Sequence, residues 1–288
     1  MADTRLACTV RGCGLALERA ERTFTCANGH AYDVARSGYI NLLQPQDRRS
    51  TEAGDARDLV TARSRLFAAH VGRAIVDAVV TASVGAVVGA IVEQVDALNL
   101  PAMPLVVDLG SGSGDVLDAI SRAGGIAGIG IDLSAAAADH AARRYPALTW
   151  VVANADRRLP LLDGSTAVVA SLHGRRNPAE CSRILAPGGF LLVAVPAHDD
   201  LIELRASVQG LGVERDRTEA LIAEHEPFLA VVSRQTARER RRVEGDVLRD
   251  LLRTTYRGAR QRTAPLVEAL ESMVVTLASE LVLFRRRP

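Results

Sequence analysis

Residues 104–120, PLVVDLGSGSGDVLDAI, decide the fold. The apolar run Leu105–Leu109 predicts a buried strand, and Gly110, Gly112 and Gly114 follow it at every second position. Apolar residues with helical spacing come next. A strand, a glycine-rich turn and a helix in this order form a cofactor loop in a parallel α/β sheet, because glycine lets the backbone approach the ligand closely. The stretch therefore predicts a Rossmann-like domain.

Strand-like and helical segments alternate after this loop. The apolar runs in GIGIDLS (residues 128–134), LTWVV (148–152), STAVVASLHG (165–174) and FLLVAVP (190–196) predict four more strands. Helical patterns separate most of these runs. We therefore expect a doubly wound α/β sheet with its ligand at the carboxyl ends of the strands.

The C-terminal part continues this pattern. Residues 227–235 and 273–287 read as the last two strands, with an antiparallel final pair, and a helical segment lies between them. The arginine-rich residues 238–242 are expected to form an exposed basic loop.

The strand ends favour S-adenosylmethionine over a dinucleotide. A G-x-G-x-x-G fingerprint lacks its third glycine here, because Asp115 or Leu117 stands at that place. Asp108 ends the first strand, where a carboxylate can pair with the methionine ammonium. Asp132 ends the second strand, about 20 residues beyond the glycine loop, where a carboxylate accepts the ribose hydroxyls. The sheet is therefore predicted to be of the class I methyltransferase type and to bind S-adenosylmethionine.

The third strand completes the predicted cofactor site. A polar side chain after this strand can reach the adenine amino group, and nearby backbone can read the ring. The further predicted contacts are Leu133, Asn154, Ala155 and Asp156. Taken singly, Asp108 or Asp132 would also suit a helix cap. Their joint position at strand ends favours the cofactor site.

A second constellation lies near the N-terminus. Cys8, Cys13, Cys26 and His30 follow the pattern C-x4-C-x12-C-x3-H. Three thiolates and one imidazole satisfy tetrahedral zinc with no open position, which is typical of a structural site. Gly12 and Gly29 suit the turns that would bring each ligand pair together. The alternative is chance cysteines beside an exposed histidine. Cys181, far from this group, is expected to be a buried apolar residue.

Composition limits the function classes. The chain has 288 residues, 48% of them hydrophobic and only 3% aromatic, and its net charge is +1. All 35 basic residues are arginine, which excludes catalysis by a lysine. Arginine exceeds acid in residues 1–75 and 234–288, so a nucleic-acid contact stays open beside ordinary solvated faces.

The sequence also bears on location and assembly. No charged segment followed by an apolar one marks a signal peptide, so we expect a cytoplasmic protein without a membrane span. The apolar residues 75–92 are expected to form a buried helix or helix pair. Residues 78–97 suit either a homodimer surface or the core.

With these parts in hand, the chain resembles the bacterial large-subunit rRNA guanine-N1 methyltransferases. The resemblance rests on the cysteine–histidine knuckle, YDVARSGYINLL (residues 32–43), GDARDLVTARSRLF (54–67), the glycine loop and HDDLIELR (198–205). That family includes housekeeping members and members that confer macrolide resistance. The resemblance implies methylation of guanine N1 in a hairpin loop of large-subunit rRNA.

The resemblance also implies that different parts of the chain bind the RNA and carry out the methyl transfer. A zinc module (residues 1–34) and a linker region (35–70) would bind rRNA beside the methyltransferase domain (71–288). Aromatic rings would stack on splayed bases and guanidinium groups would contact phosphates. The candidate RNA-binding residues are Tyr32, Arg36, Tyr39, Arg48 and Arg49. Tyr32 and Tyr39 would equally suit packing against the zinc site.

The catalytic base is left open. His173 lies at the right end of the sheet and is a weak candidate; it would also suit the pocket wall or a phosphate contact. Residues 171–177, SLHGRRN, replace the aromatic-Ala-Pro stretch typical of the family. This departure leaves two alternatives open: a related methyltransferase acting on tRNA, protein or a small molecule, and a non-catalytic RNA-binding paralogue.

Overall fold

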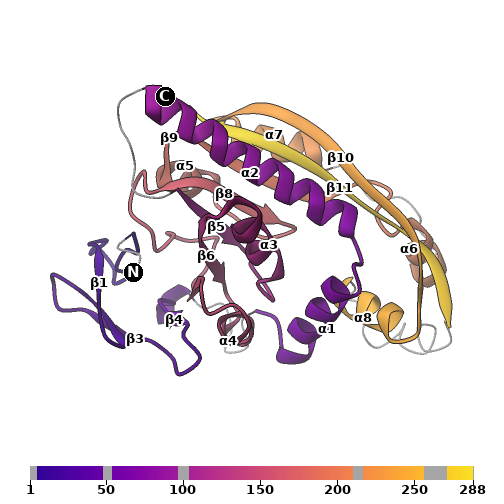
Figure 1. Cartoon of the computed structure of the whole chain (residues 1–288), viewed down its shortest axis with the longest axis horizontal. Helices are drawn as coiled ribbons and strands as arrows, with labels where there is room; N and C mark the ends of the chain where they lie inside the picture. Colours follow the sequence, from indigo (N-terminus) through magenta and orange to yellow (C-terminus); the bar gives the residue numbers. More distant parts are fainter. Residues whose placement is uncertain (1–4, 48–53, 97–103, 210–216, 256–270, 288) are drawn as a thin grey trace.

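The computed structural model describes residues 5–47, 54–96, 104–209, 217–255 and 271–287. In this part of the chain the strands form two sheets: a three-stranded antiparallel sheet and an eight-stranded mixed sheet. Figure 1 shows the small sheet at the lower left of the molecule, away from the C-terminal strands drawn in orange and yellow.

The small sheet forms the N-terminal module. Strands β1 (Leu17–Ala20), β2 (Thr23–Cys26) and β3 (Ala31–Asp33) pair in sequence order. Gly12 and Gly29 adopt φ values of 77° and 78°, in the left-handed region that glycine enters without a steric penalty. Both predicted turns are therefore present.

The centre of the large sheet is the parallel unit that the glycine loop predicts. Strands β5 (Leu105–Leu109), β6 (Ala127–Asp132), β7 (Thr149–Val152), β8 (Thr166–Leu172) and β9 (Leu185–Pro196) pair in parallel. The full strand order is β10-β11-β9-β8-β5-β6-β7-β4. Because all five carboxyl ends share one edge, side chains that follow different strands meet there.

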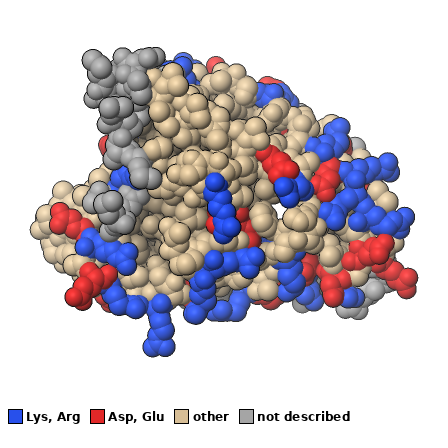
Figure 2. All heavy atoms as spheres, in the orientation of Figure 1, with Lys and Arg blue, Asp and Glu red and all other residues tan. Residues whose placement is uncertain are grey.

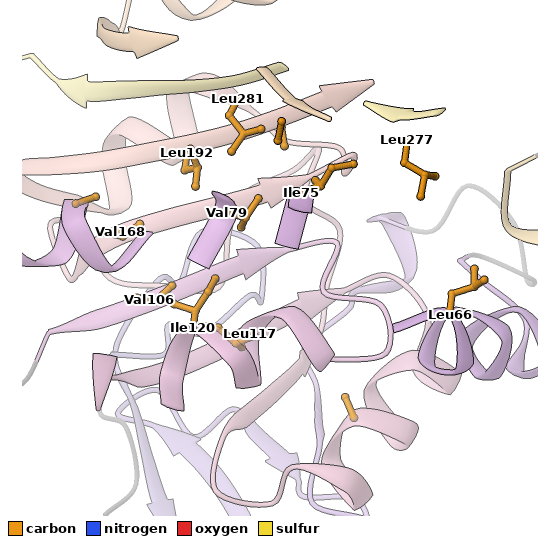
Figure 3. Close-up of a cluster of buried hydrophobic side chains, with 14 of the residues drawn as sticks. Leu66, Ile75, Val79, Val106, Leu117, Ile120, Val168, Leu192, Leu277 and Leu281 are labelled. Carbon is orange, nitrogen blue, oxygen red and sulfur yellow. The ribbon is translucent and has the colours of Figure 1, made fainter. Parts of the chain in front are cut away.

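Helices cover the first face of this sheet. Helices α2 (Arg73–Asp96), α3 (Asp115–Gly124), α4 (Ala135–Arg144) and α8 (Gly245–Thr255) contribute buried side chains to one hydrophobic cluster. Figure 3 shows part of it: Leu117 and Ile120 from α3 lie near Val106 of the sheet, and Ile75 and Val79 from α2 belong to the same cluster. Aliphatic side chains fill this layer, as the low aromatic content requires.

The second face is covered differently. Short helices α5 (Pro178–Ile184) and α7 (Thr218–His225) pack there together with the zinc module, whose Leu6, Leu17 and Phe24 join the same buried cluster. Cys181 of α5 is fully buried in this cluster, as expected for an apolar role. Helix α6 (Ile202–Gln209) lies against β11. The sheet is thus doubly wound.

The C-terminal hairpin corrects one prediction. Strands β10 (Leu229–Glu244) and β11 (Ser272–Arg286) pair antiparallel, and β11 also pairs antiparallel with β9. Arg238 and Arg242 lie within β10, opposite Ala278 and Val274, so the expected basic loop is a strand. Charged side chains on an edge strand discourage pairing with a strand of another chain, which accounts for the arginines of β10. Figure 2 shows blue side chains gathered at this end of the molecule.

Helix α2 accounts for the apolar residues 75–92. It is one helix, and it packs against α3 and strands β8 to β11. Its outer side remains open, since Val88 and Val92 are more than half exposed. The helix is long and apolar enough to cross a membrane by length and composition alone, with 33% of that window buried in the fold. A core helix passes the same test, so this is weak evidence for a span.

The expected linker region spans residues 35–70, and its described parts (35–47 and 54–70) contact the cofactor domain. Strand β4 (Ile40–Asn41) pairs in parallel with β7 and becomes the edge of the large sheet. A short 3-10 helix η1 (Pro45–Asp47) follows, and helix α1 (Arg57–Ala68) packs against α8 and α4. Arg65 of α1 forms a two-pronged ion pair with Asp250 of α8, at 2.6 and 2.7 Å.

Candidate active site and metal centre

The glycine loop has the geometry of a cofactor loop. Gly110, Gly112 and Gly114 adopt φ values of 75°, 54° and 83° between β5 and α3. A Cβ atom on Gly114 would lie 2.6 Å from the Trp150 ring, so only glycine fits beneath this turn. The loop ends at the N-terminus of α3, whose free backbone amides suit a negatively charged group.

Two carboxylates flank this loop at the strand ends. Asp132 accepts hydrogen bonds from the amides of Gly112 and Ser134, each at 2.8 Å. Asp108 is 3% exposed, and burial, with the nearby Asp132 charge, raises its pKa to about 7. A buried carboxylate beside a second one is stabilised by a cation. The methionine ammonium of S-adenosylmethionine supplies that cation, so the residues fit this cofactor.

The polar side chains at the third strand end have protein partners that the sequence does not predict. The Asn154 side chain donates to the Asp47 carbonyl at 2.9 Å and accepts from the Asp156 amide at 2.9 Å. The Asp156 carboxylate accepts from Arg175 at 2.8 Å. Asn154 thus ties the linker to this corner of the site. Leu133 and Ala155 lie partly exposed beside the same strand ends.

Arg63 is a candidate site residue that sequence reasoning missed. It extends from α1, and its Nη1 atom lies 2.9 Å from Asp55. The same nitrogen lies 3.8 Å from the position of a Cβ on Gly112. Burial lowers the pKa of Arg63, and the Asp132 carboxylate opposes that effect. A guanidinium at the glycine loop suits the methionine carboxylate. The sequence signal for Arg63 was its position within residues 54–67, but nothing there distinguished it from the many other arginines.

His173 follows β8 and has a left-handed backbone, with φ of 53°. Its Nε2 atom lies 2.8 Å from Ser279 Oγ of β11. Part of the residue is open to solvent. Burial of the ring, with a smaller effect of the nearby Arg63 charge, lowers the pKa of His173 to about 4. The ring is therefore neutral at pH 7. It lies at the predicted end of the sheet, and its role as a base stays a prediction.

The four predicted zinc ligands come together. Their ligand atoms all lie within 4.8 Å of one another. Cys13 and Cys26 have their sulfurs 3.8 Å apart, and His30 Nδ1 lies 3.4 Å from the sulfurs of both Cys8 and Cys26. Zn–S bonds of about 2.3 Å in a tetrahedron separate two sulfurs by about 3.8 Å. The residues fit zinc, and all four positions are filled by protein.

Neighbouring groups hold these ligands in place. The Tyr32 hydroxyl lies 3.1 Å from Cys8 Sγ and accepts from the Thr9 amide at 3.2 Å. Burial raises the pKa of Cys26, but the backbone amides around its sulfur outweigh this and lower it to about 7. Thiolate is the form that binds metal. The hydroxyl of Tyr32 therefore packs at the metal centre, and its ring is half-buried.

The other candidate RNA-binding residues are spread along the linker. Arg36 is exposed, whereas Tyr39 is partly buried and packs against the large core cluster. Arg48 and Arg49 lie outside the described residues. The role of these residues in RNA binding stays a prediction.

Comparison with known proteins finds a matching family for the zinc site and for the cofactor site. Residues 7–51 match the family described as RlmA, N-terminal, a zinc ribbon, and residues 106–189 match the methyltransferase domain family. The chain is 37% identical over 242 residues to a 23S rRNA (guanine(748)-N(1))-methyltransferase of Streptomyces fradiae. This match covers 82% of the chain and 80% of that protein.

The chain belongs to the 23S rRNA (guanine-N1)-methyltransferase family. A second relative, from Micromonospora griseorubida, is 38% identical and is provisionally named for the same activity; the match covers 70% of the chain and 69% of that protein. Among solved structures, a geranyl diphosphate methyltransferase is 16% identical with a TM-score of 0.41, covering 64% of the chain and 79% of that protein. A TM-score of this size supports no further conclusion.

Family membership confirms the predicted fold class, enzyme class and cofactors. The protein is a class I methyltransferase with an N-terminal zinc ribbon. S-adenosylmethionine supplies an electrophilic methyl group in such a domain. The zinc ion has a structural role, because its ligand set leaves no coordination position for a substrate.

Proposed function

We propose that the protein methylates N1 of a guanine in a hairpin loop of 23S rRNA. The observation that carries this proposal is the match to the Streptomyces fradiae enzyme over 82% of the chain. The match of residues 7–51 to the RlmA N-terminal family supports the same substrate class. The proposed substrate lies in ribosomes, so the proposed place of action is the cytoplasm.

The chain contributes mainly alignment to this reaction. Asp108 holds the ammonium, Asp132 the ribose, and the glycine loop lets the backbone approach the cofactor. In-line displacement at the sulfonium methyl then depends on how the guanine is positioned. The zinc ribbon and linker hold the RNA, with Arg36, Arg48 and Arg49 at phosphates and Tyr39 at a base.

The linker couples RNA binding to the cofactor site. Ser134, which caps α4 directly after Asp132, donates its hydroxyl to the Asp55 carbonyl at 2.6 Å. Asn154 bonds the Asp47 carbonyl in the same way. RNA that rests on the linker is therefore held at a fixed distance from the strand ends.

Primer extension tests the proposal directly. Unmodified 23S rRNA is incubated with the protein and S-adenosylmethionine, and reverse transcription is then run across it. Methyl on N1 blocks Watson–Crick pairing, so the modified guanine gives a sharp stop. We expect one stop that needs the cofactor and is lost in Asp108→Ala but kept in Arg122→Gln, an exposed arginine of α3. Cofactor binding without any stop would contradict the proposed substrate.

A homodimer remains a part of the proposal with its own test. The exposed valines of α2, Val88 and Val92, form an apolar surface that a second copy would cover. Sedimentation equilibrium separates the two states. A monomer at micromolar concentration would remove the dimer from the proposal without affecting the substrate.

A further inference from the structure

A cavity lies beside the cofactor loop at the ends of β8 and β9. Its volume is about 340 Å³, within the range of small-molecule sites. Gly174 forms the wall it shares with the loop: a Cβ on Gly110 would lie 3.3 Å from the Gly174 Cα, and a Cβ on Gly174 would lie 2.5 Å from the Leu109 carbonyl. A ligand in this cavity is therefore close to a cofactor held by the loop.

Arg176 lines this cavity and is held rigidly. Its Nε–H donates to Nε2 of His225 at 3.1 Å, and its Nη1 donates to the Gly174 carbonyl at 3.0 Å. Neither bond uses Nη2, and the described residues include no acceptor for it. The N–H groups of Nη2 are thus available to a ligand.

His225 fixes the orientation of Arg176. Its Nδ1 lies 2.7 Å from the Leu221 carbonyl, which only accepts, so Nδ1 carries the proton and Nε2 is the acceptor. The ring is fully buried and stacks on Phe284, with centroids 5.0 Å apart. Burial, with a smaller effect of Arg176, lowers the pKa of His225 and keeps it neutral. The arrangement preorganises a guanidinium at the cavity wall.

Guanine suits this cavity chemically. Its Watson–Crick edge places the acceptor O6 next to the donor N1–H, and an extruded base presents this edge to a pocket. The cavity offers the Arg176 guanidinium and, from α7, the carboxylate of Glu224. Burial lowers the pKa of Arg176, and the charges of Cys181 and Glu224 oppose this effect. A donor and an acceptor thus stand in the same pocket.

We propose that this cavity holds the extruded guanine, with Arg176 donating to O6 and Glu224 accepting the N1 proton. This inference rests on the proposed function and names its base-binding site. The N1–H electron pair stays on the base and spreads onto O6 while the proton passes to Glu224. N1 then bonds the methyl carbon, and the C–S pair returns to sulfur to leave neutral S-adenosylhomocysteine. Arg176 stabilises the negative charge on O6.

Arginine substitution gives the first test. The rate of tritiated methyl transfer to a 23S rRNA hairpin is measured from pH 6 to pH 9 for wild type, Arg176→Gln and the surface control Arg122→Gln. We expect Arg176→Gln to lower kcat by about 10²- to 10³-fold at pH 7, as for loss of an oxyanion donor. The defect should shrink as pH rises, because free guanine then ionises without help. Cofactor affinity should be unchanged.

The pH profile has a defined set of contributors. The charged and titratable groups facing the base are His173 after β8 and Arg217 and Glu224 on or beside α7. His173 stays neutral across the range, since its pKa is lowered to about 4. Glu224→Gln should lower kcat by about 10²-fold with cofactor affinity unchanged, as for loss of a general base. A loss within threefold for Arg176→Gln, or an equal loss at every pH, would overturn the role of Arg176; a loss within threefold for Glu224→Gln would overturn that of Glu224.

Two further measurements test the proposal even where Arg176→Gln or Glu224→Gln fails to fold. His225→Gln keeps a hydrogen-bond acceptor for Arg176 and should retain the wild-type pH profile. His225→Leu removes that acceptor and should change the profile as Arg176→Gln does. The same profile in the two His225 variants would contradict a positioning role for His225. RNA carrying 6-thioguanosine at the target should cross-link, under near-ultraviolet light, to a peptide of residues 173–176 or 217–224 of the wild-type protein. Cross-links only elsewhere, with methylation intact, would overturn this inference and leave the proposed function standing.

Discussion

Gly114 gives the sharpest test of the cofactor loop. Its φ of 83° costs an alanine about 1–2 kcal/mol. The added methyl would also lie 2.6 Å from the Trp150 ring and 2.8 Å from the Ala141 Cβ. Overpacking of this kind costs about 1–3 kcal/mol. We therefore expect Gly114→Ala to lower the free energy of unfolding by about 2–5 kcal/mol.

Chemical denaturation of the purified protein without cofactor measures this loss. The matched control is Gly85→Ala, since an alanine Cβ there has no neighbour within 4 Å and the residue lies within α2. Alanine in a helix is favoured over glycine, so this control should gain about 0.5–1 kcal/mol. Opposite signs for the same chemical change would localise the effect to the loop.

A second substitution separates the two causes. Trp150→Phe removes the ring atoms that the new methyl meets, so the cost of Gly114→Ala should fall by at least about 0.5 kcal/mol in that background. The backbone share of the cost should persist. A loss below about 1 kcal/mol for Gly114→Ala, or an identical loss in both backgrounds, would refute this reasoning.

Three other predictions concern the cofactor and the metal. Replacing Arg63 with Gln removes a charge-assisted bond of about 1.5–3 kcal/mol, so calorimetry should show about 10- to 100-fold weaker S-adenosylmethionine binding, with Arg122→Gln unchanged; equal affinities would exclude Arg63 from the site. The pKa of Asp108 is raised to about 7, so the carboxyl holds a proton below that pH and must lose it to pair with the ammonium. Cofactor affinity should fall as pH drops below about 7, and a pH-independent affinity would contradict this pairing. Cys13→Ser should release zinc, detected by metal analysis, and abolish RNA methylation while cofactor binding persists, whereas Cys181→Ser should retain zinc; full methylation without zinc would refute its role.

The sequence predicts those features that local patterns determine. Strands β5, β6 and β7 are short apolar runs, and the two aspartates lie at the ends of two of them, so the strand-end positions of the predicted cofactor contacts follow from the sequence. The zinc ligands are readable because turn glycines and a short loop bring each pair together. Asn154 was placed correctly at a strand end, but its side-chain partner, the Asp47 carbonyl, is far away in the chain.

Other features depend on distant pairing. Residues 238–242 look like a basic loop because charge dominates, whereas their conformation follows from fifteen-residue β11 alongside. Arg63 looks like any surface arginine until α1 packs at the site. The cavity at Arg176 needs β8, β9 and α7 together, and the tautomer of His225 follows from one carbonyl. Such contacts join segments that no local pattern relates.

Strand β4 has a consequence for how the protein can be divided. Its two residues are the outer neighbour of β7, a buried strand that would otherwise present unpaired amides and carbonyls. Uncovered edges of this kind recruit other chains. A fragment beginning at residue 71 would lose this cover together with α1, and we expect it to aggregate. The proposed boundary between the RNA-binding part and the enzyme domain is therefore not a structural boundary, because β4 of the linker is also the edge strand of the catalytic sheet.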